Sequence, residues 1–327
     1  MNRKFRILSL DGGGLRGLAE LIILKKIEDI TGKRIYELFD LIVGTSTGGI
    51  IACGLTAQKN GRPVLTVDKL IDLYNLNGDV IFPSQNNFLT KWFYGAKSII
   101  RPKYSKSGLE SQLNAYFGDI RLAETLKPII VTSYDIINNE VIIFKSRRSN
   151  EDGYNIPLKD ICRATSAAPV YLPAFEYNYL GVDRVLVDGG VYINNPAMGA
   201  IADALRHKYN NQDIKVEDIQ LLSLGTGIHS EKLGYKRKWW HKPIKRWGAF
   251  KWAAPISTVM LQASSKCVEY ECGQLPLDKF LRLQFIIDEK DRQNMDDSRE
   301  ETVRYIISTV NDQIINKRLD EIKDFFK

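Results

Sequence analysis

The sequence contains few residues of the types that build disulfide frameworks and metal sites. Of its 327 residues, four are cysteine and three are histidine. No two cysteines form a C-x-x-C pair, and no histidine, cysteine and aspartate residues have the spacing of a zinc site or an EF-hand calcium loop. We therefore expect no metal, no other cofactor and four reduced thiols, as in a cytoplasmic protein.

Long hydrophobic segments are also absent. The longest stretch without a charged residue, Leu41–Gln58, is interrupted by glycines and falls short of a membrane span. The basic N-terminus is followed by only six residues, Phe5–Leu10, before a glycine-rich turn, too few for the apolar region of a signal peptide. A content of 44% hydrophobic and 26% charged residues is typical of a globular protein with a large core.

A G-x-S-x-G pentapeptide occupies residues 44–48 and has Ser46 at its centre. It follows the apolar run Leu41–Val43 and precedes the apolar stretch Ile50–Leu55, which predicts a strand, a tight turn and a helix. In this setting a serine becomes a nucleophile, because the turn raises its hydroxyl above the sheet edge. A glycine-rich turn that serves packing alone can have the same pentapeptide.

A second glycine cluster, Asp11–Gly17, follows the predicted strand Phe5–Leu10 and precedes a helical pattern of apolar residues. Consecutive glycines expose backbone N–H groups, which can bind the oxyanion of a tetrahedral intermediate. A phosphate-binding loop is the alternative, although this cluster lacks the Lys-Ser/Thr of a P-loop and does not fit G-x-G-x-x-G. A third cluster, Asp188–Gly190, follows Val185–Val187 and can face the same sheet edge, although Asp-Gly-Gly alone is typical of a turn.

In this order, the three motifs resemble those of the patatin-like phospholipase family. The resemblance spans about the first 230 residues and includes Ser223–Gly227, which looks like a late strand end of that family. It implies a lipid acyl hydrolase with a Ser–Asp dyad, in which Ser46 is the nucleophile and Asp188 its partner. The remaining site residues that it implies are the oxyanion-hole residues Gly12, Gly13, Gly14 and Arg16 and the nucleophile-elbow residues Gly44 and Gly48.

Histidine offers a rival for the catalytic base. The order Ser46, Asp188, His229 is that of an α/β-hydrolase triad, and the ordinary pKa of histidine suits a general base better than that of aspartate. His207 ends a helical pattern and His241 lies in a basic segment, so neither competes. The family resemblance favours Asp188, whose pKa burial would have to raise.

The positive charge is concentrated in one segment. Residues 231–252 contain eight basic residues and one acidic residue. The net charge of this segment, +7, equals that of the whole chain. The segment also contains four of the five tryptophans. This mixture predicts contact with an anionic membrane surface; a solvated basic loop and a nucleotide or nucleic-acid site use the same residue types.

Apolar periodicity predicts alternating strands and helices, and therefore an α/β fold: a three-layer α/β/α sandwich with a mostly parallel central sheet. We expect a single catalytic domain over residues 1–327, with its motif-bearing core in 1–230. Strands are expected at 5–10, 40–43, 128–134, 140–145, 184–187, 219–224 and 280–287. Helices are expected at 15–30, 48–57, 67–76, 107–117, 157–166, 196–208, 255–270 and 298–325. The aromatic segment 78–106 fits neither period and predicts a lid, a packed loop or a dimer contact.

The resulting hypothesis is a cytoplasmic phospholipase at the inner face of the membrane, acting on phospholipid esters and able to form homo-oligomers. A non-catalytic protein that binds a nucleotide or nucleic acid through the glycine loop and the basic segment is the alternative. The chain's size and predicted location also resemble small bacterial patatin-like effectors of antiphage defence, which implies a cyclic dinucleotide or oligonucleotide activator.

Overall fold

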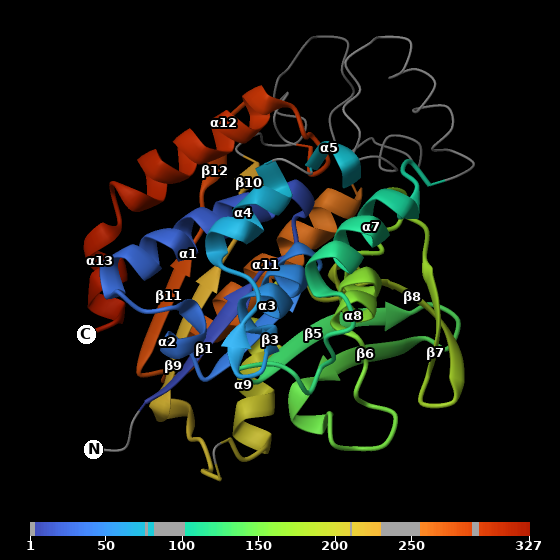
Figure 1. Cartoon of the computed structure of the whole chain (residues 1–327). Helices are drawn as coiled ribbons and strands as arrows, with labels where there is room; N and C mark the ends of the chain where they lie inside the picture. The colour runs from blue at the N-terminus through green and yellow to red at the C-terminus, as the bar shows by residue number, and fades with distance from the viewer. Residues whose placement is uncertain (1–3, 76–77, 82–101, 210, 230–255, 290–293) are drawn as a thin grey trace, which may run out of the picture.

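The computed structural model describes residues 4–75, 78–81, 102–209, 211–229, 256–289 and 294–327 (Figure 1). At its centre is an eight-stranded sheet. The strands of this sheet are β1 (Phe5–Leu10), β2 (Leu41–Thr45), β5 (Ile129–Asp135), β6 (Glu140–Lys145), β7 (Phe175–Tyr179), β8 (Val182–Asp188), β9 (Ile219–Leu224) and β11 (Lys279–Leu283). Two small sheets pair β3 (Gln58–Lys59) with β4 (Arg62–Pro63) and β10 (Ile228–His229) with β12 (Ile286–Ile287).

The strand order is β11-β9-β1-β2-β5-β8-β7, and β6 pairs with β5 outside this path. Neighbouring strands from β11 to β5 are parallel, whereas β6, β7 and β8 join in antiparallel pairs. The sheet is therefore mostly parallel, as predicted, with an antiparallel end. The carboxyl ends of its parallel strands meet at one edge, where ligand and catalytic sites of open α/β sheets form.

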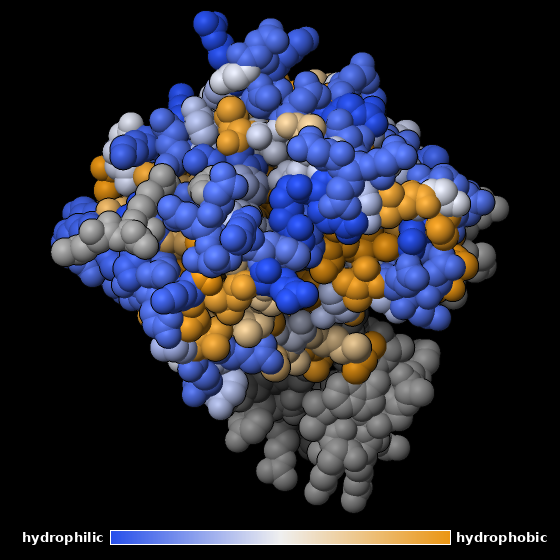
Figure 2. Space-filling model, turned by 90° about the horizontal axis from the view of Figure 1, so that it is seen from below, coloured by the Kyte–Doolittle hydropathy of each residue, from blue (hydrophilic) through white to orange (hydrophobic). Residues whose placement is uncertain are grey.

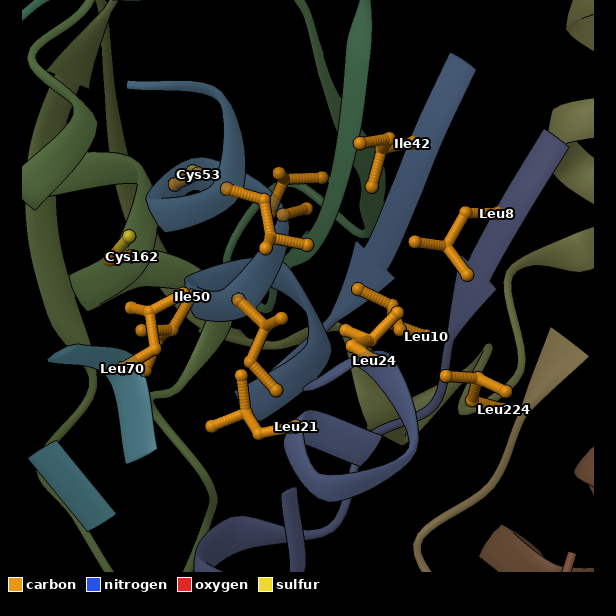
Figure 3. Packing of buried hydrophobic residues seen from close by; sticks show 14 of the residues in the cluster. Leu8, Leu10, Leu21, Leu24, Ile42, Ile50, Cys53, Leu70, Cys162 and Leu224 are labelled. Carbon is orange, nitrogen blue, oxygen red and sulfur yellow. The ribbon is translucent and has the colours of Figure 1, made fainter. Parts of the chain in front are cut away.

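Helices cover both faces of the sheet because successive residues of each strand point apolar side chains to opposite faces. Leu8, Leu10 and Ile42 point into one hydrophobic cluster, with α1, α3, α4 and α12 around it. Figure 3 shows Leu8, Leu10 and Ile42 packing there. Ile7 and Val43 point the opposite way, into a second cluster under α9 and α11. This period of two places a helical layer on each side and gives the three-layer α/β/α sandwich.

The helices agree closely with the sequence pattern. They are α1 (Gly17–Thr31), α2 (Ile35–Leu38), α3 (Thr47–Thr56), α4 (Val67–Asn75), α5 (Gly78–Ile81), α7 (Lys106–Phe117), α8 (Leu158–Thr165), α9 (Ala197–Arg206), α11 (Ile256–Gln274), α12 (Glu300–Val310) and α13 (Leu319–Phe325). The prediction of one long C-terminal helix at 298–325 was wrong. It is divided by a π-helical turn at Asn311–Ile315, through which the buried apolar positions continue.

Two sequence-based expectations concern residues outside the described part of the chain. The basic segment 231–252 lies wholly outside it, as does most of the aromatic segment 78–106. In the described residues, no helix has both the length and the apolar character needed to cross a membrane. Figure 2 shows one face from below, where the described surface is mostly hydrophilic and hydrophobic side chains gather in separate patches.

Candidate active site

Ser46 occupies a strained turn between β2 and α3. Its φ of 55° and ψ of −121° are unfavourable for a residue with a side chain and cost about 1–3 kcal/mol. The turn is held in part by Thr165 at the end of α8, whose Oγ1 accepts the Ser46 N–H at 2.8 Å. Such strain, supported from a second element, is characteristic of a functional position.

The glycines of the elbow are required by close backbone approach. A Cβ at Gly44 would lie 2.1 Å from the carbonyl oxygen of Gly48, and one at Gly48 would lie 2.4 Å from that of Leu10. Any side chain would therefore push α3 away from the sheet. Both glycines predicted from the pentapeptide thus serve the sharp turn from β2 into α3.

Asp188 reaches Ser46 because β2 and β8 run toward each other along the same side of β5. The opposite side of β5 is paired with β6. The last residue of β2, Thr45, pairs with Thr132, and the last residue of β8, Asp188, pairs with the next residue of β5, Ser133. The two strands meet end to end, so Asp188 lies beside the residue that follows Thr45.

The Asp188 carboxylate is buried and has two polar neighbours. The N–H of Gly190 donates to Oδ1 at 2.7 Å, and the Ser46 hydroxyl lies close enough to act on the pKa of the carboxylate. Burial disfavours the charged carboxylate and raises the pKa of Asp188 to about 6, although the Ser46 hydroxyl and the Gly190 N–H both lower it. Asp188 can therefore be ionised near neutral pH and still take up a proton more readily than an ordinary aspartate.

The glycine loop lies directly beside Ser46. A Cβ at Gly12 would be 3.3 Å from that of Ser46. The Gly12 N–H donates to the Asn194 carbonyl at 3.0 Å, so this amide is already engaged. Within the described residues, the N–H groups of Gly13 and Gly14 have no acceptor. These two amides are free to bind an anion next to the serine.

Arg16 is not among the residues that line the large cavity with Ser46. It lines a neighbouring small cavity of about 30 Å³ together with Gly12 and Thr226. Its burial, without a carboxylate partner among the described residues, lowers the pKa of the guanidinium to about 10. One of its nitrogens, Nη1, lies 3.2 Å from Nε2 of His229. Because a guanidinium only donates, the contact fits a neutral imidazole that accepts at Nε2.

The two described histidines have partners other than Ser46 and Asp188. His229 contacts Arg16, and the hydrogen bond at Asp188 Oδ1 comes from the Gly190 N–H rather than from an imidazole. His207 lies 3.8 Å from Asp203 at the end of α9, as a partly exposed residue. His241 belongs to the undescribed segment. The geometry of the described residues favours a dyad over a triad.

A cavity of about 540 Å³ opens beside the dyad. Ser46, Asp188, Gly13 and Gly14 line it at one place. Most of its other walls are apolar and include Leu15, Ile50, Leu73, Ile81, Leu109, Leu113, Leu172, Val191 and Leu261. An apolar cavity with a few convergent polar groups suits a long hydrocarbon chain that carries one reactive polar group.

Several residues of this site were missed by the sequence reasoning. Thr165 holds the nucleophile turn, Asn194 engages Gly12, and the Thr226 hydroxyl donates to the Gly12 carbonyl at 2.8 Å. None belongs to the three glycine clusters, although Thr226 lies within the segment Ser223–Gly227 that adds to the family resemblance. The only available signal was their position close to the ends of predicted strands or helices, where polar residues gather at the sheet edge.

Comparisons with known proteins identify the family to which the chain is similar. The family model described as patatin-like phospholipase matches residues 8–201, which contain all three motifs. Patatin-like protein 2 of Arabidopsis thaliana is 34% identical over 81% of this chain and 70% of its own length. Patatin-like protein 2 of Oryza sativa subsp. japonica is 32% identical, with 89% and 80% covered, and patatin group J-1 of Solanum tuberosum is 30% identical, with 81% and 70% covered.

A solved structure, VipD from Legionella pneumophila, is similar at a TM-score of 0.41 and 9% identity and covers 98% of this chain and 74% of that one. The family assignment depends on the matched motifs and on the identities to the plant proteins, which extend over most of the chain. The chain belongs to the patatin-like phospholipase family, and its general activity is that of a lipid acyl hydrolase.

Proposed function

We propose that the protein is a phospholipase A-type enzyme that cleaves acyl esters of membrane phospholipids through a Ser46–Asp188 dyad. The observation that carries this proposal is the end-to-end meeting of β2 and β8, which brings the Ser46 hydroxyl beside a buried carboxylate. The free amides of Gly13 and Gly14 and the apolar cavity lie at the same place. A nucleophile, a base, an oxyanion site and an acyl site are thus within reach of one ester.

In the first half of the reaction, the Ser46 oxygen forms a bond to the ester carbonyl carbon while its proton moves to Asp188. The carbonyl oxygen becomes an oxyanion that accepts hydrogen bonds from Gly13 and Gly14. The intermediate then expels the lysophospholipid alkoxide, which takes the proton from Asp188, and the acyl group remains on Ser46. In the second half, a water oxygen forms a bond to the acyl carbon while Asp188 takes a proton from that water. The bond between the acyl carbon and Ser46 then breaks, the serine oxygen takes the proton back from Asp188, and the fatty acid is released.

The high pKa of Asp188 supports its role as the base. An ordinary aspartate is too acidic to accept a serine proton efficiently. Burial raises the pKa of Asp188 and so narrows the gap between its pKa and that of the serine hydroxyl. The position of Ser46 at the N-terminus of α3 adds a favourable field for negative charge that develops on its oxygen.

We further propose that the enzyme works as a peripheral protein at the cytoplasmic membrane surface. The basic, tryptophan-rich segment 231–252 has the composition that anionic headgroups attract. Activation by a cyclic oligonucleotide follows from the resemblance to antiphage effectors, and stays a prediction with the same segment as its candidate binding region. Adding a cyclic dinucleotide to the liposome assay tests it.

Covalent labelling tests the proposed chemistry. A fluorophosphonate probe should react with the wild-type protein, and peptide mass spectrometry should locate the adduct on Ser46. Ser146→Ala is the matched control, because Ser146 accepts a backbone hydrogen bond from Ile129 at the opposite end of β5. Labelling that survives Ser46→Ala would contradict the proposal, and a complete absence of labelling would favour the non-catalytic nucleotide-binding alternative.

A further inference from the structure

The glycine loop is tied to a buried arginine from the far end of the chain. Arg282, in the edge strand β11, donates Nη1 to Asp11 Oδ1 at 2.9 Å and Nη2 to Asp11 Oδ2 at 2.6 Å. Its Nη1 also donates to the Ser223 hydroxyl at 2.8 Å. The side chains of Arg282 and Asp11 are 6% and 2% exposed. This is a two-point ion pair with little access to water, in which position and direction are both fixed.

Asp11 is the residue at which β1 turns into the loop. Its N–H lies 2.8 Å from Glu20 Oε1 in α1 and 3.2 Å from the Leu224 carbonyl in β9. Its carboxylate is occupied by Arg282. Both the backbone and the side chain of Asp11 are therefore anchored, so the direction in which the chain leaves β1 is set by these contacts.

The other end of the loop is also held by the last part of the chain. The carbonyl oxygen of Met295 accepts the Leu15 N–H at 2.8 Å, and a Cβ at Gly14 would lie 2.5 Å from the same oxygen. The free amides of Gly13 and Gly14 lie between these two attachments. The family match ends at residue 201, so Arg282 and Met295 both belong to the part of the chain outside it.

We propose that Arg282 is a positioning residue for the hydrolysis: by fixing Asp11, it aims the Gly13 and Gly14 amides at the oxyanion. This inference rests on the proposed function. Arg282 touches no reacting atom, and its effect is transmitted through Asp11. A buried ion pair is weak support for net stability, because the cost of desolvating both charges offsets their attraction. Because the pair fixes Asp11 at the start of the glycine loop, it has a role in positioning the loop that does not depend on a net gain in stability.

The test measures turnover of a soluble short-chain ester per active site, with active sites counted by fluorophosphonate titration. Arg282→Gln should lower kcat by about 10- to 100-fold, because small displacements of catalytic groups cost that much. KM should change by less than about threefold, since the lost interaction is made with the transition state. Arg282→Lys should recover only part of kcat, because an ammonium cannot form the two-point pair.

Arg147→Gln is the matched control. Arg147 forms an ion pair with the buried Asp203 through contacts of 3.1 and 3.2 Å. The neighbouring residue Lys145 of β6 lies opposite Ile130 near the start of β5, away from Ser46. This variant removes an arginine from a buried carboxylate, although Asp203 keeps Lys145 as a partner at 2.6 Å, and it should keep its kcat per active site. A role limited to folding would lower the number of active sites in both variants and leave kcat unchanged.

A double-mutant cycle links the effect to Asp11. Asp11→Asn combined with Arg282→Gln should be no slower than the worse single variant, because both break the same attachment. If Arg282→Gln does not fold, Ser223→Ala carries the test. It keeps both charges and removes one anchor, and it should lower kcat by about threefold or more.

An unchanged kcat per active site in Arg282→Gln or, where that variant does not fold, in Ser223→Ala would overturn the inference, as would additive effects in the cycle. In those cases Ser46 would still be labelled in the wild type, and the proposed function would stand. If the wild type showed no labelling at Ser46, the proposed function would fail and this inference with it.

Discussion

The guanidinium of Arg16 lies 3.2 Å from Nε2 of His229, the histidine that rivals Asp188 as the catalytic base in the sequence. The buried Asp188 carboxylate meanwhile lies next to the Ser46 hydroxyl, which lowers its pKa. We therefore expect Asp188→Asn to lower kcat/KM by about a thousandfold or more, because an amide cannot take the serine proton. His229→Gln should have an effect of less than about tenfold on the same short-chain ester.

The comparison between these two variants separates the mechanisms. Both should give the same thermal unfolding profile as the wild type, since each change preserves the side chain's approximate size. An essential His229 together with a dispensable Asp188 would show that a triad operates and that the dyad assignment is wrong.

Small substitutions in the glycine loop should remove turnover. A Cβ at Gly13 would lie 2.2 Å from Thr226 Oγ1, and one at Gly14 would meet the Met295 carbonyl at a φ of +58°. Gly13→Ala and Gly14→Ala should therefore shift the amides, and loss of one oxyanion donor costs about 3–4 kcal/mol of barrier. Gly199→Ala in α9 is the control, because its nearest neighbour would be 3.8 Å away. Wild-type rates in both loop variants would exclude this oxyanion site.

The pH profile reports on Asp188. Burial raises its pKa to about 6, and only the ionised carboxylate can accept the proton. The kcat/KM of the free enzyme should therefore be constant above this pKa and fall as pH decreases, to about a tenth of its plateau one unit below. Rates measured between pH 4 and 8 on a neutral ester test this. A profile that stays flat to pH 4 would argue against Asp188 as the base.

The basic segment should govern contact with membranes. Replacing Lys236, Arg237 and Lys238 with Glu should weaken binding to anionic liposomes, because each basic residue near such a surface contributes about 1 kcal/mol. Cleavage of a soluble ester should be unchanged. A triple reversal at the exposed residues Arg304, Lys323 and Lys327 serves as the control.

The result at low salt decides between the uses of this segment, since salt screens such attraction. Liposome binding that persists in the variant, while a response to a cyclic dinucleotide disappears, would assign the segment to a ligand. A variant that is only less stable would assign it to the fold.

Local patterns identified most of the fold because the buried strands and helices have clear periods. The β1 strand and the α1 helix lie within two residues of their predicted positions. The β7 strand was missed, although Phe175–Tyr179 alternates, because its pairing depends on a tight turn at Leu180 and Gly181. The division of the C-terminal helix was also missed, because its apolar positions continue through the π turn.

The two residues of the proposed dyad could be named from the sequence, whereas the way they meet could not. Motifs placed Ser46 and Asp188 at strand ends, but no local pattern gives the antiparallel direction of β8 or its meeting with β2 on β5. Thr165 and Arg282 were not predictable for a related reason. They act through contacts that span 119 and 271 positions along the chain, and one sequence carries no signal for such pairs.

The most direct test of the central claim is lipid mass spectrometry of mixed phospholipid liposomes incubated with the wild type and with Ser46→Ala. The wild type should release free fatty acid and lysophospholipid in equal amounts. Ser46→Ala should fold normally, because it removes one oxygen at a turn, and release should fall by about a thousandfold or more. Fatty acid release by pure Ser46→Ala at a rate near that of the wild type would contradict the account.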